Sequence, residues 1–173
     1  MNNKASPTTL AYLAGMIDGD GYITINRSER NGKVYHAPQV GIAGTRREPH
    51  DLAAGLFGGS VGIYYPRNPA HRPQYQWSRQ GASAVEVIRA IQPYLLVKIE
   101  HSWLALQLWD HIELGKSDDP FPWFFPDYCP IPDRDDMRDE MIAMNQSRNR
   151  MGKKSAGRLL DGVQHDGYPE PRP

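Results

Sequence analysis

Asp20 is the residue whose setting first suggests chemistry, because it ends a segment in which small residues recur at helical spacing. Ala11, Gly15 and Gly19 stand at i, i+4 and i+8, so one helix face carries almost no side chain and a second helix could approach closely. An interior glycine costs about 1 kcal/mol relative to alanine, which predicts that such packing compensates for Gly15. Two helices crossing on this face would bring two Asp20 carboxylates together, and divalent cations between them would offset their repulsion.

An aspartate that merely ends a helix is the ordinary alternative for Asp20. A carboxylate at a helix C-terminus is disfavoured by the helix dipole. This electrostatic cost suggests that Asp20 has a function at this position. Glycines that only end a helix would explain Gly19 and Gly21 but not Gly15. The pattern therefore favours a helix that packs on a partner and presents Asp20 at its end.

The segment that carries this aspartate predicts a helix followed by a β-hairpin. Apolar residues at helical spacing predict a helix over residues 7–20, which Gly21 ends. Residues 22–27 alternate between polar and apolar, as in a half-buried strand. Asn31-Gly32 is a strong hairpin turn, so residues 33–42 are expected to form the returning strand.

A second helix and hairpin follow the first. Residues 48–57 predict a short helix that Gly58-Gly59 closes. Residues 61–67 and 74–79 predict two strands joined by a loop rich in proline and arginine. The repeated order of helix, strand, strand predicts an α+β fold with one four-stranded antiparallel sheet.

Helical patterns dominate the chain after the sheet. Residues 83–96 and 99–114 place apolar residues at helical spacing, with Pro93 interrupting the first run. Residues 117–132 contain many prolines and aromatic residues and predict an irregular segment packed on the body, and residues 133–145 predict a short last helix.

Length and composition exclude several classes of protein. The 173 residues suit one domain, expected over residues 1–160, with residues 161–173 as a flexible tail. No stretch approaches the roughly 18 apolar residues that a membrane span needs. The N-terminus lacks the apolar region of a secretory signal, and the single cysteine, Cys129, cannot form an internal disulfide, so we expect an intracellular chain. The glycines near Gly58 follow a helix and precede a strand, the reverse of a dinucleotide site, so no nucleotide cofactor is expected.

The net charge is zero, but the charges are segregated along the chain. Residues 22–79 hold eight basic side chains against three acidic ones, and residues 144–160 hold five basic side chains and no acidic one. Residues 80–132 are acidic, with seven acids against three bases. This segregation is what a polyanion-binding face on an acidic body would produce, and an ordinary solvated surface produces it too.

Residues 13–21 read Leu-Ala-Gly-Met-Ile-Asp-Gly-Asp-Gly and resemble the defining motif of the LAGLIDADG homing endonuclease family. They differ from it at Met16 and Gly19. The predicted order of elements, αββαββα, is that family's core fold. The rest of the chain holds no second motif, since residues 51–59 have the small residues but no final acid. The resemblance is therefore to the single-motif type, most closely to the group I intron-encoded enzymes.

A single motif implies a homodimer packed through the motif helices. Each chain would contribute one Asp20 and one four-stranded sheet to a saddle over double-stranded DNA. The two-fold axis predicts a pseudo-palindromic target with half-sites about 10 bp apart from centre to centre. The residues expected at the dimer interface are Ala11, Tyr12, Gly15, Met16 and Gly19.

The resemblance also implies the catalytic residues. Mg²⁺ would lie at the paired Asp20 carboxylates, beside Gly19. Lys98 ends a segment that resembles the start of the helix after the sheet in those enzymes, where a lysine reaches the cleavage centre, with a plain surface lysine as the alternative. The family often has a glutamine just after the second strand, and here this place falls near Gly44. The candidates to order water in its stead are Thr45, Arg46 and Arg47.

The alternation of the strands nominates side chains for contact with DNA bases, because a β-ribbon can enter a major groove and polar side chains can bond base edges there. Arg148 and Arg150 belong to a segment resembling the C-terminal loop with which such enzymes touch backbone phosphates. The candidates on the strands are Tyr22, Thr24, Asn26, Lys33, Tyr35, Gln39, Tyr65, Arg67, Gln74, Gln76 and Ser78.

These inferences predict a site-specific, Mg²⁺-dependent endonuclease that makes a double-strand break and leaves four-base 3′ overhangs, as the family does. An intron RNA maturase, or a DNA-binding regulator that does not cleave, is the alternative on the same fold. Regulators of that kind typically lose the acid, so the intact Asp20 favours the enzyme. The expected location is a bacterial or phage-infected cytoplasm, or an organelle.

Overall fold

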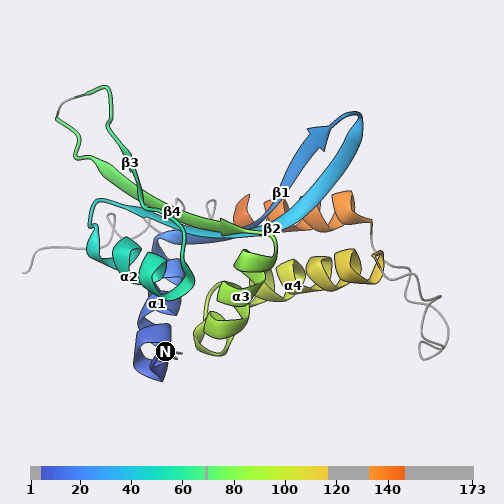
Figure 1. Ribbon diagram of the computed structural model, residues 1–173, viewed down its shortest axis with the longest axis horizontal. Coiled ribbons are helices and arrows are strands. Elements are labelled where there is room, and N and C mark those ends of the chain that lie inside the picture. The colour runs from blue at the N-terminus through green and yellow to red at the C-terminus, as the bar shows by residue number, and fades with distance from the viewer. Residues whose placement is uncertain (1–4, 69, 117–132, 147–173) are drawn as a thin grey trace, which may run out of the picture.

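The computed structural model describes residues 5–68, 70–116 and 133–146, which build a four-stranded antiparallel sheet with helices on one face (Figure 1). The strands lie in the order β1-β2-β4-β3. The tips of the two hairpins rise away from the helices at either end of the sheet, and the face between them is uncovered (Figure 1). The α+β fold predicted from the sequence is confirmed.

The first helix, α1, spans Pro7–Gly19. It starts where expected because the Ser6 hydroxyl accepts a hydrogen bond from the backbone N–H of Thr9 at 3.1 Å, which satisfies one of the open donors of the first turn. Asp20 caps the other end, where its backbone N–H donates to the carbonyl of Met16. The apolar face of α1 lies in the core, with Leu13 and Ile17 fully buried.

The first hairpin joins β1 (Gly21–Arg30) to β2 (Lys33–Gly44). Asn31 and Gly32 form the turn with φ of 53° and 72°, the left-handed conformations that an Asn-Gly hairpin turn requires. The pairing runs from Gly21 opposite Ile42 to Arg30 opposite Lys33. The predicted hairpin is therefore confirmed, with both strands longer than the alternation indicated.

The second hairpin corrects one prediction. After α2 (Glu48–Phe57), strand β3 covers only Gly62–Tyr64, whereas the sequence predicted a strand over residues 61–67. Pro66 has no N–H for the ladder, which explains why pairing with β4 (Gln74–Gln80) stops at Tyr64 opposite Gln74.

The helices after the sheet correct a second one. The helix predicted over residues 83–96 is shorter: α3 spans Ala82–Ile91, and a single 3₁₀ turn, η1 (Gln92–Tyr94), follows it. Pro93 lacks an N–H and its ring crowds the preceding turn, so the α-helix cannot continue through it. The next helix, α4, spans Ile99–Leu114 as predicted. A last helix over residues 134–146 also agrees with the prediction.

The core lies between the sheet and the helices. Ile23, Val40, Ile42 and Trp77 point into it from the strands and are almost fully buried, and residues 137 and 141 join it from the last helix. Because side chains alternate between the faces of a strand, every second residue of β1, β2 and β4 lies on the uncovered face. No helix in the described part of the chain is long and apolar enough to cross a membrane.

Candidate active site and nucleic-acid interface

The chain turns sharply from α1 into β1 at Gly21, and Asp20 is exposed at this turn. A Cβ added at Gly21 would lie 2.7 Å from the carbonyl oxygen of Gly41 and 2.7 Å from the Cα of Ile17, so only glycine fits there. Among the residues that the structure describes, the Asp20 carboxylate has no hydrogen-bond or ion-pair partner. It is therefore accessible for a ligand at the carboxyl end of α1.

The other aspartate of the motif, Asp18, is buried and saturated with hydrogen bonds. One carboxylate oxygen, Oδ2, accepts from the backbone N–H groups of Leu96 at 2.7 Å and Val97 at 3.1 Å, and Oδ1 accepts from that of Lys98 at 2.9 Å. Burial alone would raise the pKa of Asp18, but the three N–H groups and the nearby Lys98 charge outweigh burial and hold this pKa below its ordinary value.

Lys98 reaches back to the end of α1. It is only 5% exposed, and its ammonium donates to the carbonyl oxygens of Ile17 and Asp18, both at 2.7 Å. A cation at the carboxyl end of a helix is favourable because it satisfies open carbonyls and opposes the negative end of the dipole. The alternative of a plain surface lysine is therefore wrong, and Lys98 lies at the turn that carries Asp20. Its catalytic role stays a prediction.

The sequence reasoning missed Asp18. A second aspartate two residues before Asp20 was visible in the motif, but its partners at residues 96–98 lie about 80 positions away in the sequence. Such a partnership follows from the tertiary fold, and no local pattern of the sequence reveals it.

The loop between β2 and α2 holds the three candidates for ordering water. Thr45, Arg46 and Arg47 are all exposed. Arg47 makes an ion pair with Asp51 at 3.1 Å, one helical turn further on. Their role at the centre stays a prediction.

His50 is the buried polar residue of this loop region. Its ring Nδ1 hydrogen-bonds the carbonyl oxygen of Arg46 at 2.8 Å, and its Nε2 has no partner within the described residues. A Cβ added at Gly44 would lie 3.6 Å from this ring, an ordinary van der Waals distance, so the ring of His50 lies beside Gly44. His50 is only 1% exposed, as a structural histidine is.

The uncovered face of the sheet carries most of the side chains predicted to contact bases. The register pairs Thr24 with Gln39, Gln39 with Gln80, and Gly41 with Ser78 across three neighbouring strands. Cross-strand partners share a face, and this face is opposite the buried isoleucines. The predicted residues placed on it are Tyr22, Thr24, Asn26, Lys33, Tyr35, Gln39, Gln74, Gln76 and Ser78. The register puts them on one face of the sheet, and their contacts with bases remain predictions.

Tyr22 lies flat against this face. A Cβ added at Gly41, its cross-strand partner, would lie 2.6 Å from the Tyr22 hydroxyl, so the ring occupies the space above the glycine. The same hydroxyl accepts a hydrogen bond from the side-chain amide of Gln39 at 3.2 Å. Tyr22 thus holds Gln39 in place as well as presenting its own edge.

The two candidates assigned to the third strand lie beyond it. Because β3 ends at Tyr64, neither Tyr65 nor Arg67 belongs to the sheet. Tyr64 pairs with Gln74 and takes the position on the uncovered face that was assigned to Tyr65. Arg148 and Arg150 lie outside the described residues, as do Cys129, the segment over 117–132 and the tail.

The small-residue face of α1 is open to the surroundings. Ala11, Tyr12, Gly15 and Gly19 are exposed and Met16 is partly exposed. A Cβ added at Gly15 or Gly19 would meet none of the described residues within 4 Å, so no packing among them requires a glycine at either position. The exposed side chain of Leu96, on the segment bound to Asp18, lies near the end of the same helix. This open face agrees with the predicted contact with a second copy.

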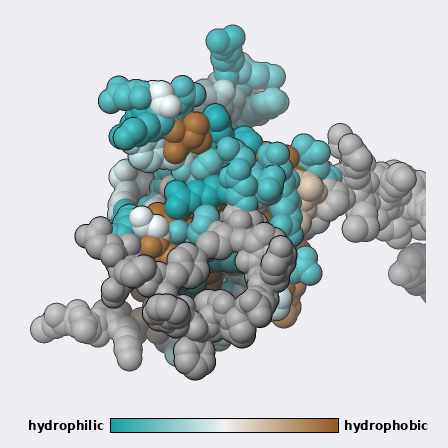
Figure 2. All heavy atoms as spheres, turned by 90° about the vertical axis from the view of Figure 1, so that its right-hand side faces the viewer, coloured by the Kyte–Doolittle hydropathy of each residue, from teal (hydrophilic) through white to brown (hydrophobic). Residues whose placement is uncertain are grey.

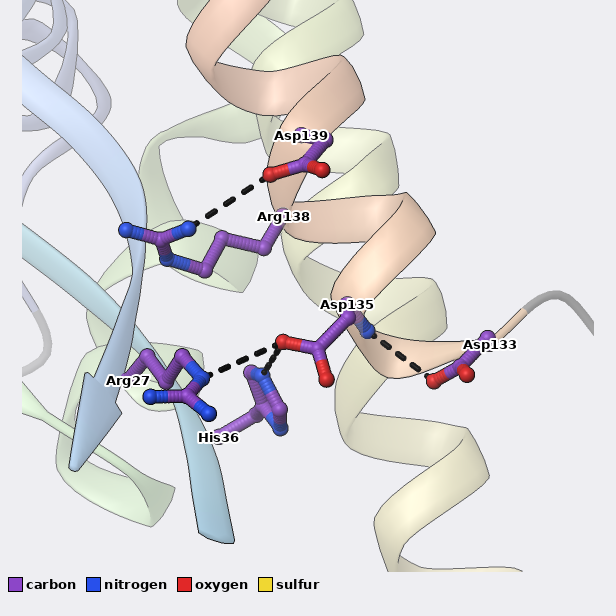
Figure 3. Close-up of polar contacts among 6 residues, drawn as sticks. All are labelled: Arg27, His36, Asp133, Asp135, Arg138 and Asp139. Carbon is purple, nitrogen blue, oxygen red and sulfur yellow. Dashed lines mark hydrogen bonds and ion pairs between the residues drawn. The ribbon is translucent and has the colours of Figure 1, made fainter. Parts of the chain in front are cut away.

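A second polar cluster ties the outer part of the first hairpin to the last helix (Figure 3). One carboxylate oxygen of Asp135 bonds the ring Nε2 of His36 at 3.0 Å and the Nε of Arg27 at 3.3 Å. Arg27 and His36 are cross-strand partners on the helix-covered face. The hydrogen bond from His36 is the largest effect that lowers the pKa of Asp135, and the charge of Arg27 adds to it.

On the side of the molecule where this hairpin ends, hydrophilic side chains dominate the upper part (Figure 2).

No protein-family model and no curated protein matches the sequence. Solved structures do match. The homing endonuclease I-CvuI in complex with its target in the presence of Ca is 19% identical, with 63% of this chain and 70% of that chain covered and a TM-score of 0.50. The group I intron-encoded homing endonuclease I-CeuI complexed with DNA is 12% identical, with 66% and 60% covered and a TM-score of 0.51.

A third structure, the homing endonuclease I-TnaI, is 16% identical, with 62% of this chain and 75% of that chain covered and a TM-score of 0.51. At sequence identities this low, the matches show the fold alone. The chain therefore has the fold of the LAGLIDADG homing endonucleases, and the family resemblance drawn from residues 13–21 is confirmed at this level.

Proposed function

We propose that this protein is a site-specific DNA endonuclease that acts as a homodimer. The observation that carries the proposal is the position of the exposed Asp20 at the end of an open glycine face, directly beside an uncovered sheet of polar side chains. In this arrangement, a duplex bound on the polar sheet face would lie next to the carboxylate that acts on it. The similarity to endonucleases solved with DNA supports the same conclusion.

The homodimer would form through the small-residue face of α1. Two copies of this helix can approach closely because Ala11, Gly15 and Gly19 offer no bulk to each other. A two-fold axis between the helices would bring one Asp20 from each copy to the same place and align two sheets along one duplex. The expected target is therefore long and pseudo-palindromic.

The residues at this centre fit a divalent cation. The Asp20 carboxylate is exposed and without a partner, and carboxylates are the ligands that Mg²⁺ prefers. Within the described residues of one chain, no three His, Cys, Asp or Glu side chains gather as a metal site, which agrees with a site completed by a second copy. Bound there by Asp20 and beside Gly19, Mg²⁺ would supply Lewis acidity for attack by water on the phosphate.

The chain's own groups have separate tasks in this proposal. The polar sheet face binds the duplex and sets its register over the two Asp20 carboxylates. Lys98 places a positive charge at the carboxyl end of α1, where it opposes the charge of the helix end and of the carboxylates. Thr45, Arg46 or Arg47 would order water near the phosphate, and Arg148 and Arg150 would contact the backbone. By resemblance to the family, the products carry four-base 3′ overhangs.

Cleavage of a plasmid library of randomised pseudo-palindromic sites tests this proposal. Purified protein with Mg²⁺ should produce discrete double-strand breaks with four-base 3′ overhangs, and the same protein with Ca²⁺ should bind the site without cutting. The Asp20→Asn variant should bind the selected site and leave it intact. Specific binding without cutting by the unmodified protein with Mg²⁺ would contradict the endonuclease and turn attention to a regulator or an intron RNA maturase.

A further inference from the structure

The two aspartates of the motif stand two residues apart in opposite environments. The Asp20 carboxylate is exposed and without a partner, whereas the Asp18 carboxylate is buried and accepts three backbone hydrogen bonds. The three donors belong to the residues that immediately precede α4. The Asp18 carboxylate, at the end of α1, therefore caps the N-terminus of α4. A negative charge there is favourable because it opposes the positive end of the α4 dipole.

Lys98 completes the connection in the opposite direction. Its backbone N–H donates to Asp18, and its ammonium donates to the carbonyls of Ile17 and Asp18 at 2.7 Å each. Five hydrogen bonds thus join two residues of α1 to residues 96–98, and every one of them involves a charged group. Charge-assisted hydrogen bonds in a buried setting are the strong ones.

The turn that carries Asp20 is fixed on both sides as a result. On the N-terminal side, Ile17 and Asp18 are held by residues 96–98. On the C-terminal side, Gly21 packs on Ile17 and pairs with Ile42 in the sheet. The backbone N–H of Asp20 itself donates to Met16 at 2.9 Å. The exposed carboxylate is thus mounted on a rigid stretch of backbone.

We propose that Asp18 is a positioning residue for Asp20: by clamping the end of α1 to the start of α4, together with Lys98, it holds the Asp20 carboxylate where two copies share their cations. The proposal rests on the proposed function and adds to it a residue that does not touch DNA or metal. It also gives Lys98 a task that its burial explains, namely holding backbone carbonyls. Loss of either half of the clamp should let the turn at residues 19–21 move.

The test compares Asp18→Asn with the unmodified dimer, using Asp110→Asn as the matched control. Asp110 is an exposed aspartate of α4 whose ion pair with Arg89 lies far along the helix from the clamp. Single-turnover cleavage of the selected site is measured against Mg²⁺ concentration, DNA affinity is measured with Ca²⁺, and backbone hydrogen exchange is measured without DNA.

Asp18→Asn should lower the maximal cleavage rate by about 10- to 100-fold and raise the Mg²⁺ concentration needed for half of it, as loss of residues that orient a ligand does. DNA affinity should change less than about twofold, because the sheet face is untouched. Exchange should accelerate at residues 19–21 and 96–98 above the rest of the chain. Asp110→Asn should match the unmodified protein in all three measurements.

Wild-type cleavage rate and Mg²⁺ dependence in a folded Asp18→Asn variant would overturn the proposal, as would exchange that rises evenly over the whole chain. If Asp18→Asn does not fold, Lys98→Met breaks the other half of the clamp and carries the same expectations. A lysine that only acts on the phosphate would slow cleavage in Lys98→Met and leave exchange at residues 19–21 unchanged. If the unmodified protein does not cleave, the proposed function fails, and the exchange pattern still decides whether Asp18 fixes the turn.

Discussion

Asp18 and Asp135 each tie together segments that are distant in the sequence, but they do so in opposite settings. Asp18 joins the end of α1 to the start of α4 inside the protein, where it is 8% exposed. The side chain of Asp135 is 53% exposed and joins the last helix to the outer part of the β1–β2 hairpin (Figure 3). We therefore expect the Asp18 contacts to hold a fixed geometry and the Asp135 contacts to be weaker.

The difference follows from solvation. A buried carboxylate that loses its partners cannot recover them from water, so breaking the Asp18 contacts carries the full cost of desolvation. Water and ions screen the pair between Asp135 and Arg27, and water replaces lost bonds there at little cost. The buried aspartate lies beside Asp20, whose carboxylate is proposed to act on DNA, whereas the exposed one contacts Arg27 and His36 of the β1–β2 hairpin.

The largest effect should come from a bulky side chain on the small-residue face of α1, next to the buried Asp18. In Gly15→Leu, the new Cβ meets no atom of the described residues within 4 Å, so the melting temperature of the monomer should not fall, but two helices can no longer approach. Sedimentation should show a monomer, and cleavage of the selected site should be lost. Gly55→Leu is the matched control, because Gly55 lies in a helix and is equally open. A dimeric Gly15→Leu protein would place the interface elsewhere.

Asp18→Asn should give the next largest effect, on stability. The variant keeps the shape of the side chain but weakens three charge-assisted bonds, which should lower the free energy of unfolding by about 2–3 kcal/mol. For a chain of this size, this corresponds to a fall in melting temperature of about 4–12 °C, measured by calorimetry. A fall no larger than that of Asp135→Asn would erase the contrast between the two aspartates.

A smaller effect should separate two basic residues of the same hairpin. Lys33 lies on the uncovered face, so Lys33→Gln should reduce the slope of log affinity against log salt by about 0.9 if it neutralises one phosphate. Arg27 lies on the opposite face and pairs with Asp135, so Arg27→Gln should leave the slope unchanged. The measurement is DNA affinity over a range of salt concentrations. Equal changes in both variants would mean that the exposed cluster opens when DNA binds.

The smallest effect should come from Asp135→Asn, and it should depend on pH. The pKa of Asp135 in the folded protein lies below the ordinary value of 3.8, so the carboxylate stabilises the fold at neutral pH. This contribution is lost as the pH falls below 3.8 and through the lowered pKa. Melting temperatures of the two proteins should differ by at most a few degrees at pH 7 and converge in acid. A difference that grows in acid would have the wrong sign for this contact.

Much of the fold could be predicted because its signals are local. The helix over residues 99–114 and the turn at Asn31-Gly32 depend on periodicity and on glycine chemistry that neighbouring residues determine. The alternation of β1, β2 and β4 placed the polar face correctly for the same reason. The prediction for β3 failed where residues with high strand propensity precede Pro66, which removes a donor that the ladder needs.

The candidate site was only partly predictable. Asp20 and the open face of α1 follow from spacing alone, and Lys98 was found through the family resemblance. The contacts of Asp18 with residues 96–98 were not predicted, because only the tertiary fold brings these residues beside the end of α1. Arg27 was counted among the basic residues available to a polyanion, but the fold turns it toward Asp135. Charge counts along a sequence do not tell which face a side chain takes.

The five hydrogen bonds between residues 17–18 and 96–98 also have a kinetic side. They close a loop of about 80 residues, so they raise the contact order of the chain. A chain emerging from the ribosome lacks these contacts until residues 96–98 have left the exit tunnel. Chains that end before Lys98 therefore lack the arrangement that is proposed to cut DNA.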